Sequence, residues 1–408
     1  MLRDDTVQAL TQTDVDEAIA ANDDLARQGF RVLGLAARHG DESLITLRAQ
    51  ELEQNLIFIG LIAMFDPPRS EVASAIAQCH TAGIKVTMVT GDYGLTAEAI
   101  ARKIGLVGNE ENLHVGSGDR LEHRVRVITG DGMGHLSDAQ LRQILKYRSA
   151  LVFARMSPEH KLRLVQAYKD MGEIVAVTGD GVNDAPALRA AHIGIAMGMN
   201  GTDVAREAAD IVLTDDNFAT IVIAVEQGRA VYQNIRKFMT YILASNVAEL
   251  VPFLLMVTLK IPPALVIMQI LIIDLGTDIL PALALGAERA EAGTMNQSPR
   301  QKSHPLLDRS LLLRAYCFLG VLEAALGMSA FFLVWWSYGY GLKELQAVTP
   351  RLLAHSANAA TVAIYAQATT MTLATIVACQ DGNVFACRSE RTSILRLGFF
   401  SNPLIWIG

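Results

Sequence analysis

Cysteine is scarce in this sequence, with four residues among 408. No two of them form a Cys-x-x-Cys pair, so neither a disulfide framework nor a zinc site is indicated. We expect all of them to be reduced packing residues; they are Cys79, Cys317, Cys379 and Cys387.

An excess of positive charge is also absent, because the formal net charge is −7 at pH 7. Proteins that bind nucleic acid normally present a basic face, so we expect no nucleic-acid partner. The N-terminus from Met1 to Asp5 lacks the apolar core of a signal peptide. We therefore expect the first half of the chain to remain in the cytoplasm.

Apolar residues are abundant, at 51% of the sequence, which exceeds the usual content of a soluble globular protein. From Phe218 a helical pattern runs unbroken to about Leu259, which corresponds to a helix on the order of 60 Å long. Such a helix would join a cytoplasmic domain to a membrane span. Complete spans are expected near 239–259, 264–285, 311–336 and 354–379, and the start of a fifth near 399–408.

The distribution of basic residues gives the expected orientation. Arg236 and Lys237 precede the first span, and further arginines lie between the second and third spans and after the fourth. Short loops rich in Lys and Arg remain on the cytoplasmic side. We expect a multi-pass protein of the plasma or inner membrane, with its N-terminal domains in the cytoplasm.

The N-terminal half alternates short apolar strands with helices, which predicts a doubly wound parallel sheet with helices on both faces. Residues 105–150 are polar and Gly-rich and look like an insertion outside the core. Pro252 and Pro281 lie in the expected spans, where they can locally break the two helices and free backbone carbonyls for a ligand. The fold class expected for the whole chain is α/β plus membrane α-helical.

One loop dominates the N-terminal half, from Val177 to Leu188, with the sequence Val-Thr-Gly-Asp-Gly-Val-Asn-Asp-Ala-Pro-Ala-Leu. It follows an apolar strand and precedes a helix, so it lies at the carboxyl end of a strand, where α/β sheets place their ligands. Asp180, Asn183 and Asp184 supply the hard oxygen ligands that suit Mg²⁺. The alternative is an ordinary turn, since Gly, Asp and Asn all favour turns.

The expected spans carry polar residues at helical spacing. Asn246 and Glu249 are one turn apart, and Asp274, Thr277 and Asp278 share a face of the next helix. Carboxylates at membrane depth are costly unless they are paired or bind cations, which favours a cation site. The alternative is a set of polar groups that satisfy one another within a helix bundle.

These motifs resemble, in order, the C-terminal part of a P-type cation-transporting ATPase of the second class, the group of the calcium and sodium–potassium pumps. The resemblance covers nearly the whole chain. It rests on Asp66-Pro67-Pro68-Arg69, Thr90-Gly91-Asp92, Pro158-Glu159-His160-Lys161, the loop from Thr178 to Leu188, Ser245 to Glu249, and Asp274 to Asp278. It implies a haloacid-dehalogenase-like sheet joined by a long stalk helix to a transmembrane bundle.

The resemblance also implies a division into regions and a set of roles. Residues 1–54 would be the end of a nucleotide-binding domain, 55–217 a phosphorylation domain without its first motif, and 218–408 the stalk and bundle. ATP would be the substrate and Mg²⁺ the cofactor. The residues implied for phosphate and Mg²⁺ are Thr90, Gly91, Lys161, Asp180, Asn183 and Asp184; those for nucleotide are Arg31, Asp92 and Arg155; those for the transported cation are Asn246, Glu249, Asp274, Thr277, Asp278 and Gln380.

The chain departs from the family in one respect that bears on activity. The phosphorylated aspartate of the family lies in an Asp-Lys-Thr-Gly-Thr motif, which is absent from these 408 residues. We therefore expect that this chain alone neither forms a phosphoenzyme nor hydrolyses ATP. Its expected partners are a lipid bilayer, the transported cation, ATP and the N-terminal half of such a pump.

The identity of the cation stays open among Na⁺, K⁺ and Ca²⁺, because size and rigidity of the site decide it rather than carboxylate count. The stretches around Asp274 and Pro252 are closer to the sodium–potassium branch, whereas Gln380 and Asn383 fit neither branch. Two other functions remain open: a non-catalytic cation-binding or regulatory fragment, and a membrane-anchored haloacid-dehalogenase-type phosphatase.

Overall fold

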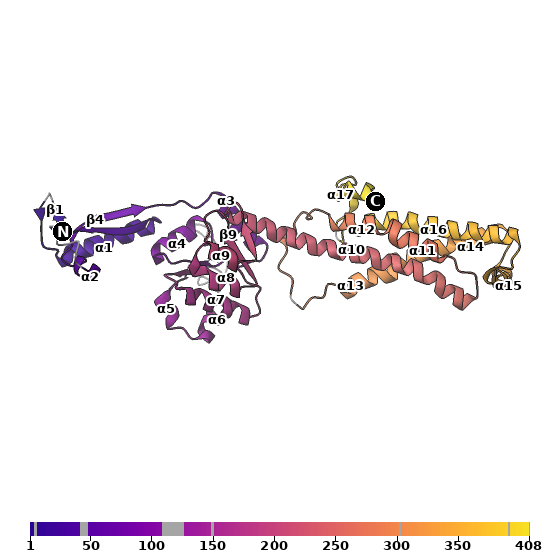
Figure 1. Cartoon of the computed structure of the whole chain (residues 1–408), viewed down its shortest axis with the longest axis horizontal. Coiled ribbons are helices and arrows are strands. Elements are labelled where there is room, and N and C mark those ends of the chain that lie inside the picture. Colours follow the sequence, from indigo (N-terminus) through magenta and orange to yellow (C-terminus); the bar gives the residue numbers. More distant parts are fainter. Residues whose placement is uncertain are drawn as a thin grey trace, which may run out of the picture. The chain divides into compact units, whose positions relative to one another are not determined.

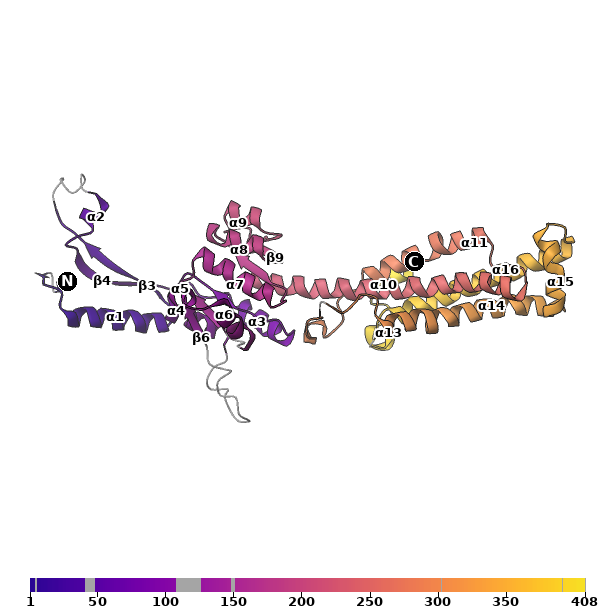
Figure 2. The same ribbon diagram turned by 90° about the horizontal axis from the view of Figure 1, so that it is seen from below.

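The structure is a computed structural model that describes residues 1–3, 6–40, 48–107, 126–147, 151–301, 303–390 and 392–407. Its contacts divide the chain into two compact units. The first comprises Met1–Ile223 with Met295–Pro299, and the second comprises Ala224–Thr294 with Arg300–Gly408. Figures 1 and 2 show the helices and strands of both units in two views.

The first unit begins with a helix and an antiparallel pair of strands. Thr11 caps the helix α1 (Gln12–Arg27) through a capping box with Asp14, because each side chain accepts the backbone N–H of the other. Strands β3 (Arg31–Ala37) and β4 (Ile57–Met64) pair antiparallel, with Arg31 opposite Met64. Strand β4 thus pairs with β3. Short elements complete this segment: β1 (Leu2–Arg3), β2 (Thr6–Val7) and α2 (Ala49–Leu52).

The remaining strands of the first unit form two parallel sheets of three strands each. One has the order β5-β7-β6, and the other has the order β10-β9-β8. The predicted parallel sheet is thereby confirmed as parallel strands alternating with helices. The strands are β5 (Met88–Val89), β6 (Arg126–Thr129), β7 (Leu151–Ala154), β8 (Ala176–Gly179), β9 (Ile193–Met197) and β10 (Ile211–Leu213).

Helices lie between these parallel strands along the chain, because parallel pairing needs a crossover connection. The central strand β7 is wholly buried, whereas Ala176 and Thr178 on the outer strand β8 are exposed. Strands β5 and β8 are each an outer strand of their sheet. The connecting helices are α3 (Glu71–Thr81), α4 (Gly94–Lys103), α5 (Gly130–Gly134), α6 (Asp138–Tyr147), α7 (Pro158–Asp170), α8 (Ala185–Ala190) and α9 (Asp203–Ala208).

The expectation that residues 105–150 lie outside the core is wrong for the part that the structure describes. Strand β6 pairs with β7 along its whole length, and Met133, Leu141 and Leu145 are fully buried. Residues 108–125 and 148–150 of that range lie outside the described residues. The polar, Gly-rich composition of this range gave no sign of the short strand β6. Its partner β7 lies further along the chain, so only the pairing in the structure shows that β6 belongs to the core.

The second unit is built on the long helix α10 (Phe218–Leu259), whose first residues belong to the first unit. Among the described residues, four helical stretches are long and apolar enough to cross a membrane: Phe218–Leu259, Ile267–Gly286, Arg309–Ser337 and Ala359–Cys387. The fourth lies later in the chain than the predicted 354–379, because α15 (Leu342–Leu353) precedes it. In the predicted fifth span near 399–408, the described residues contain only the single turn α18 (Leu404–Ile407), which follows the single turn α17 (Ile394–Leu397).

The second spanning stretch is interrupted by a π-helix, η4 (Ile273–Thr277), between α11 (Ile267–Ile272) and α12 (Ile279–Gly286). The break predicted at Pro252 is wrong, because α10 continues through it and membrane helices satisfy the backbone groups that a proline frees. Near Pro281 the α-helix is interrupted locally: the π-helix ends at Thr277, whose carbonyl lacks an N–H donor because Pro281 stands four residues later. The third stretch contains α13 (Arg309–Leu312), the π-helix η6 (Leu313–Leu319) and α14 (Gly320–Ser337), and the fourth is α16 (Ala359–Cys387).

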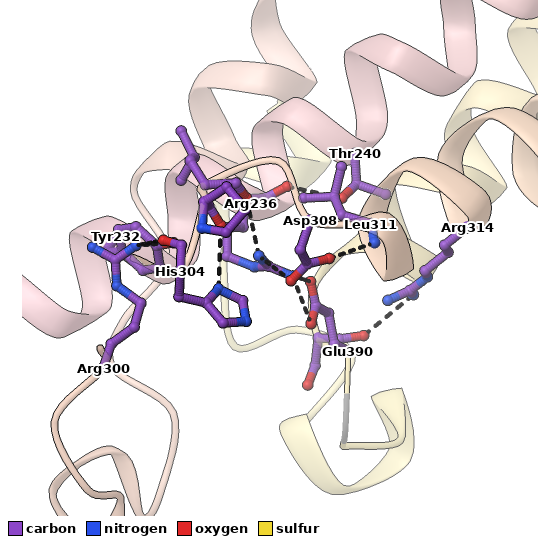
Figure 3. Close-up of polar contacts among 12 residues, drawn as sticks. Tyr232, Arg236, Thr240, Arg300, His304, Asp308, Leu311, Arg314 and Glu390 are labelled. Carbon is purple, nitrogen blue, oxygen red and sulfur yellow. Dashed lines mark hydrogen bonds and ion pairs between the residues drawn. The ribbon is translucent and has the colours of Figure 1, made fainter. Parts of the chain in front are cut away.

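Ion pairs join separate segments at one end of this bundle (Figure 3). Arg236 on α10 lies 2.8 Å from an Asp308 carboxylate oxygen and 3.1 Å from Glu390, which follows α16. Asp308 also accepts the Leu311 N–H at 2.8 Å and so caps α13. Arg300 stacks on the Tyr232 ring, with 3.9 Å from its guanidinium carbon to the ring centroid. The loops before α13 and after α16 are thereby fixed to α10.

Candidate functional site

The loop after β8 is held by a short contact between two of the predicted residues. Lys161, in the first turns of α7, places its Nζ 2.6 Å from Oδ1 of Asp184. The other oxygen of Asp184 accepts the Gly181 N–H at 3.1 Å. A Cβ at position 179 would lie 2.4 Å from the Asp184 Cβ, so glycine is required there for the loop to close.

The same loop leaves Asp180 and Asn183 exposed. Within the described part of the chain, the Asp180 carboxylate has no hydrogen-bond or ion-pair partner, whereas both oxygens of Asp184 are engaged. A hard cation such as Mg²⁺ prefers carboxylate oxygens and keeps several waters. The residues present fit Mg²⁺, with Asp180 as the free ligand and Asp184 as the residue that orients the loop.

The loop after β5 forms a second group of predicted residues. Thr90 Oγ1 donates to Asp92 Oδ2 at 2.9 Å, and the Asp92 N–H donates back to Thr90 Oγ1 at 3.1 Å. The Arg155 N–H donates to the Asp92 carbonyl at 3.1 Å, which fixes this loop to the end of β7. Arg155 has a φ of 53°, a left-handed conformation that is uncommon for a residue with a side chain. Gly91 is exposed beside them.

Sequence reasoning missed Tyr93 in this group. Its ring lies under the Arg155 guanidinium, with 5.0 Å from the guanidinium carbon to the centroid, and its hydroxyl donates to Asp23 on α1 at 3.1 Å. Partial burial, followed by the bond to Asp23, raises the pKa of Tyr93. Its position directly after Thr90-Gly91-Asp92 was the available signal. Among the described residues, no hydrogen bond or ion pair joins Arg31 on β3, or the β8 loop, to this group.

The second unit brings three predicted residues together. Ligand oxygens of Glu249, Asp274 and Asp278 all lie within 4.8 Å of one another. Glu249 is half-buried, Asp274 is exposed and Asp278 is buried, and Oε1 of Glu249 is a buried oxygen with no hydrogen-bond partner. Such a cluster of carboxylates is a suitable site for a cation. We call these three residues the carboxylate cluster.

The other predicted cation residues surround this cluster. Asn246 lines a cavity of about 220 Å³ together with Asp274 and Asp278. Thr277 Oγ1 donates to Gln380 Oε1 at 3.0 Å, and Gln380 donates to Ser245 Oγ at 2.7 Å. The predicted set from α10, η4 and α16 is therefore connected in space.

Tyr241 is a further residue that sequence reasoning missed. It is fully buried on α10, and its hydroxyl donates to Asp278 Oδ1 at 3.1 Å. It lies one turn before Ser245 on the same face of the helix, which was the only signal in the sequence.

The fold and the two sets of residues define a class of protein: a membrane protein with a haloacid-dehalogenase-like domain and a carboxylate site within its helical bundle. Family models agree with both parts. Residues 6–192 match the haloacid dehalogenase-like hydrolase model, and residues 262–408 match the model of the C-terminus of cation transporting ATPases.

Curated relatives extend this match over nearly the whole chain. The sodium/potassium-transporting ATPase subunit alpha of Drosophila melanogaster is 40% identical over 367 residues, which cover 84% of this chain and 35% of the relative. Subunit alpha-1 from Oreochromis mossambicus is 38% identical, with coverage of 98% and 42%. The potassium-transporting ATPase alpha chain 2 of Cavia porcellus is 39% identical, with coverage of 87% and 36%.

This chain belongs to the P-type cation-transporting ATPases. It matches a C-terminal portion of them, and the chain spans well under half the length of these curated relatives.

Proposed function

We propose that this chain is the part of an ATP-driven cation pump that couples Mg²⁺-dependent aspartyl phosphorylation to cation transport. The observation that carries the proposal is the carboxylate cluster within helices of spanning length, in the same chain as the Lys161–Asp184 pair. A soluble phosphatase does not need a carboxylate cluster within spanning helices, and a simple channel does not need the Lys161–Asp184 pair.

On the phosphate side, each residue has a physical role. Phosphoryl transfer depends chiefly on positioning and on neutralising charge. Lys161 neutralises phosphate oxygens while Asp184 holds its ammonium in place, and Thr90 and Gly91 donate hydrogen bonds to the phosphate. Asp180 holds Mg²⁺, which supplies further charge neutralisation when bound. Arg31, Asp92 and Arg155 contact the nucleotide.

The two outer strands β5 and β8 support an additional part of this proposal. Both precede loops that carry phosphate residues, and both leave one edge unpaired among the strands that the structure describes. An unpaired strand edge is a ready template for another strand. We infer that a strand carrying the phosphorylated aspartate docks at these edges, supplied by sequence outside these 408 residues. The chain alone then forms no phosphoenzyme.

On the membrane side, the cluster and its neighbours bind the transported cation. Asn246, Thr277 and Gln380 supply neutral oxygens beside the three carboxylates. The sequence of the α10 and η4 region and the names of the relatives both favour Na⁺ or K⁺ over Ca²⁺. The first unit and the loop after α16 lie in the cytoplasm, and the membrane is a plasma or inner membrane.

Acid-stable labelling with radioactive ATP and Mg²⁺ tests the coupling. The chain alone should remain unlabelled, and co-expression with a segment that carries Asp-Lys-Thr-Gly-Thr should produce a label that Asp180→Asn abolishes. A label on the chain alone would contradict the proposed strand. Cation binding without any label in the complemented protein would support a non-catalytic cation-binding fragment instead.

A further inference from the structure

Tyr93, the residue directly before α4, is not used by any of the roles above. Its side chain is 37% exposed, and the Arg155 guanidinium lies over its ring, with 5.0 Å from the guanidinium carbon to the centroid. In the part of the chain that the structure describes, the Arg155 side chain makes no hydrogen bond and no ion pair. The five N–H donors of its guanidinium are therefore available to a ligand, while the face of the group rests on Tyr93.

The backbone of Arg155 is held by the loops that follow two neighbouring strands. Its N–H donates to the Asp92 carbonyl at 3.1 Å, and the N–H of Met156 donates to the Thr90 carbonyl at 3.0 Å. A Cβ at Gly130, which follows β6, would lie 2.4 Å from the Arg155 carbonyl oxygen. A left-handed φ such as the 53° of Arg155 persists only where the surrounding structure holds it, and such residues are common at ligand sites. The carboxyl ends of β5, β6 and β7 thus meet at this residue.

The Tyr93 ring is fixed through its hydroxyl, which donates to Asp23 on α1 at 3.1 Å. One turn further along α4, Thr96 Oγ1 donates to the Phe30 carbonyl at 2.9 Å. Phe30 directly precedes Arg31, the first residue of β3. The beginning of α4 therefore contacts Arg155 on one strand end and the segment that leads to Arg31 on another.

An arginine that is already oriented binds a ligand more tightly than one that moves freely. Its long side chain loses rotamer freedom when it meets a ligand, and this loss opposes binding. Stacking on an aromatic ring restricts the guanidinium beforehand and leaves its donors free. An ion pair with a carboxylate would also restrict it, but it would occupy donors and neutralise the charge that a phosphate needs.

We propose that Tyr93 is a positioning residue for the nucleotide: its ring holds the Arg155 guanidinium, with the donors free, where β5, β6 and β7 end. The inference rests on the proposed function, in which Arg155 contacts the nucleotide. It adds that Tyr93 acts through Arg155, and that the ring rather than the hydroxyl is the part that Arg155 requires.

The test measures the affinity of the full chain, in lipid nanodiscs with Mg²⁺, for the non-hydrolysable ATP analogue AMP-PNP by titration calorimetry. Tyr93→Leu removes the ring and should weaken the affinity about two- to five-fold, as expected for one exposed cation–π contact. Tyr93→Phe keeps the ring and should retain the native affinity. Tyr232→Leu removes the ring beneath Arg300 in the second unit, and as the matched control it should leave the affinity unchanged.

A double-mutant cycle shows whether Tyr93 acts through Arg155. Arg155→Met should also weaken binding of AMP-PNP, and the addition of Tyr93→Leu to that variant should weaken it no further. A Tyr93 that only stabilises the fold would weaken binding to the same extent with Arg155 or Met at position 155. Independent effects of the two substitutions would therefore overturn the proposal.

Tyr93→Trp keeps the proposal testable where Tyr93→Leu fails to fold. An indole ring attracts a cation more strongly than a phenol ring, and the partial exposure of Tyr93 leaves room for it. This variant should bind AMP-PNP at least as tightly as the native chain, and weaker binding would contradict a stacking role.

The outcomes also separate this inference from the proposed function. If Arg155→Met weakens the binding of AMP-PNP and Tyr93→Leu does not, only the role of Tyr93 is wrong. If the native chain does not bind AMP-PNP, or if Arg155→Met leaves its affinity unchanged, the nucleotide role of Arg155 is wrong and the role of Tyr93 is wrong with it.

Discussion

The Nζ of Lys161 lies 2.6 Å from Asp184 Oδ1, and the two side chains are 19% and 11% exposed. The contact joins α7 to the loop after β8, which are distant in sequence and adjacent in the first unit. Because the pair is largely shielded from water, its electrostatic coupling should exceed that of a surface ion pair.

A double-mutant cycle measures that coupling. Lys161→Met, Asp184→Asn and the double variant should give a coupling free energy of about 1–2 kcal/mol in thermal or urea unfolding. The exposed pair Arg27–Asp24, with side chains 60% and 72% exposed, is the matched control. Its coupling should be about 0.5 kcal/mol or less. Equal couplings for the two pairs would show that burial of Lys161 contributes nothing.

Gly179→Ala should distort the β8 loop. The added Cβ would lie 2.4 Å from Asp184 Cβ, so either the loop or α8 must move. We expect a destabilisation of about 1–3 kcal/mol. Gly228→Ala on α10 is the control, because nothing lies within 4 Å of its added Cβ and alanine favours the helix. Differential scanning calorimetry should show a lower unfolding temperature for Gly179→Ala and a higher one for Gly228→Ala. If both temperatures shift in the same direction, the steric argument is wrong.

Asp308 should make the unfolding temperature depend on pH. Its bonds from the Leu311 N–H and from Arg236 hold its pKa below the ordinary value. A carboxyl with a lowered pKa contributes stability above its unfolded pKa of about 3.9, and the contribution is lost as the pH falls through the folded pKa. Asp308→Asn should therefore unfold at a lower temperature near neutrality and approach the native chain in acid. If the unfolding temperatures of the native chain and of Asp308→Asn differ by the same amount at every pH in this range, the ion pairs of Figure 3 do not influence stability.

Tyr241→Phe should weaken cation binding at the carboxylate cluster. The hydroxyl bond to Asp278 Oδ1 at 3.1 Å fixes the direction of that carboxylate. Loss of one such bond costs about 1 kcal/mol, which corresponds to about a five-fold weaker affinity. Tyr365→Phe is the control, since Tyr365 donates to the Pro263 carbonyl. If calorimetric titrations with Na⁺ gave the two variants equal affinities, Tyr241 would have no role in cation binding at the carboxylate cluster.

The sequence alone determined which parts of the chain form strands and helices, and it predicted the chemistry of the candidate sites. Strand and helix periodicity, a long apolar helix from Phe218 and the loop from Thr178 to Leu188 are local patterns, and local patterns specify elements and motifs. Spacing on a helix likewise identified Glu249, Asp274 and Asp278, because the face of a helix follows from residue number.

Tertiary structure decided what depends on contacts between distant residues. Pairing with β7 placed β6 in the core, and among the described strands β5 and β8 each have an unpaired edge because the strands form two separate sheets. A local break near Pro281 was predicted from the sequence, but its form, a π-helix over Ile273–Thr277, was not. Glu323 lies in an apolar stretch of the sequence; only the packing of α14 against α10 and α16 showed that it is buried and accepts a hydrogen bond from Asn383.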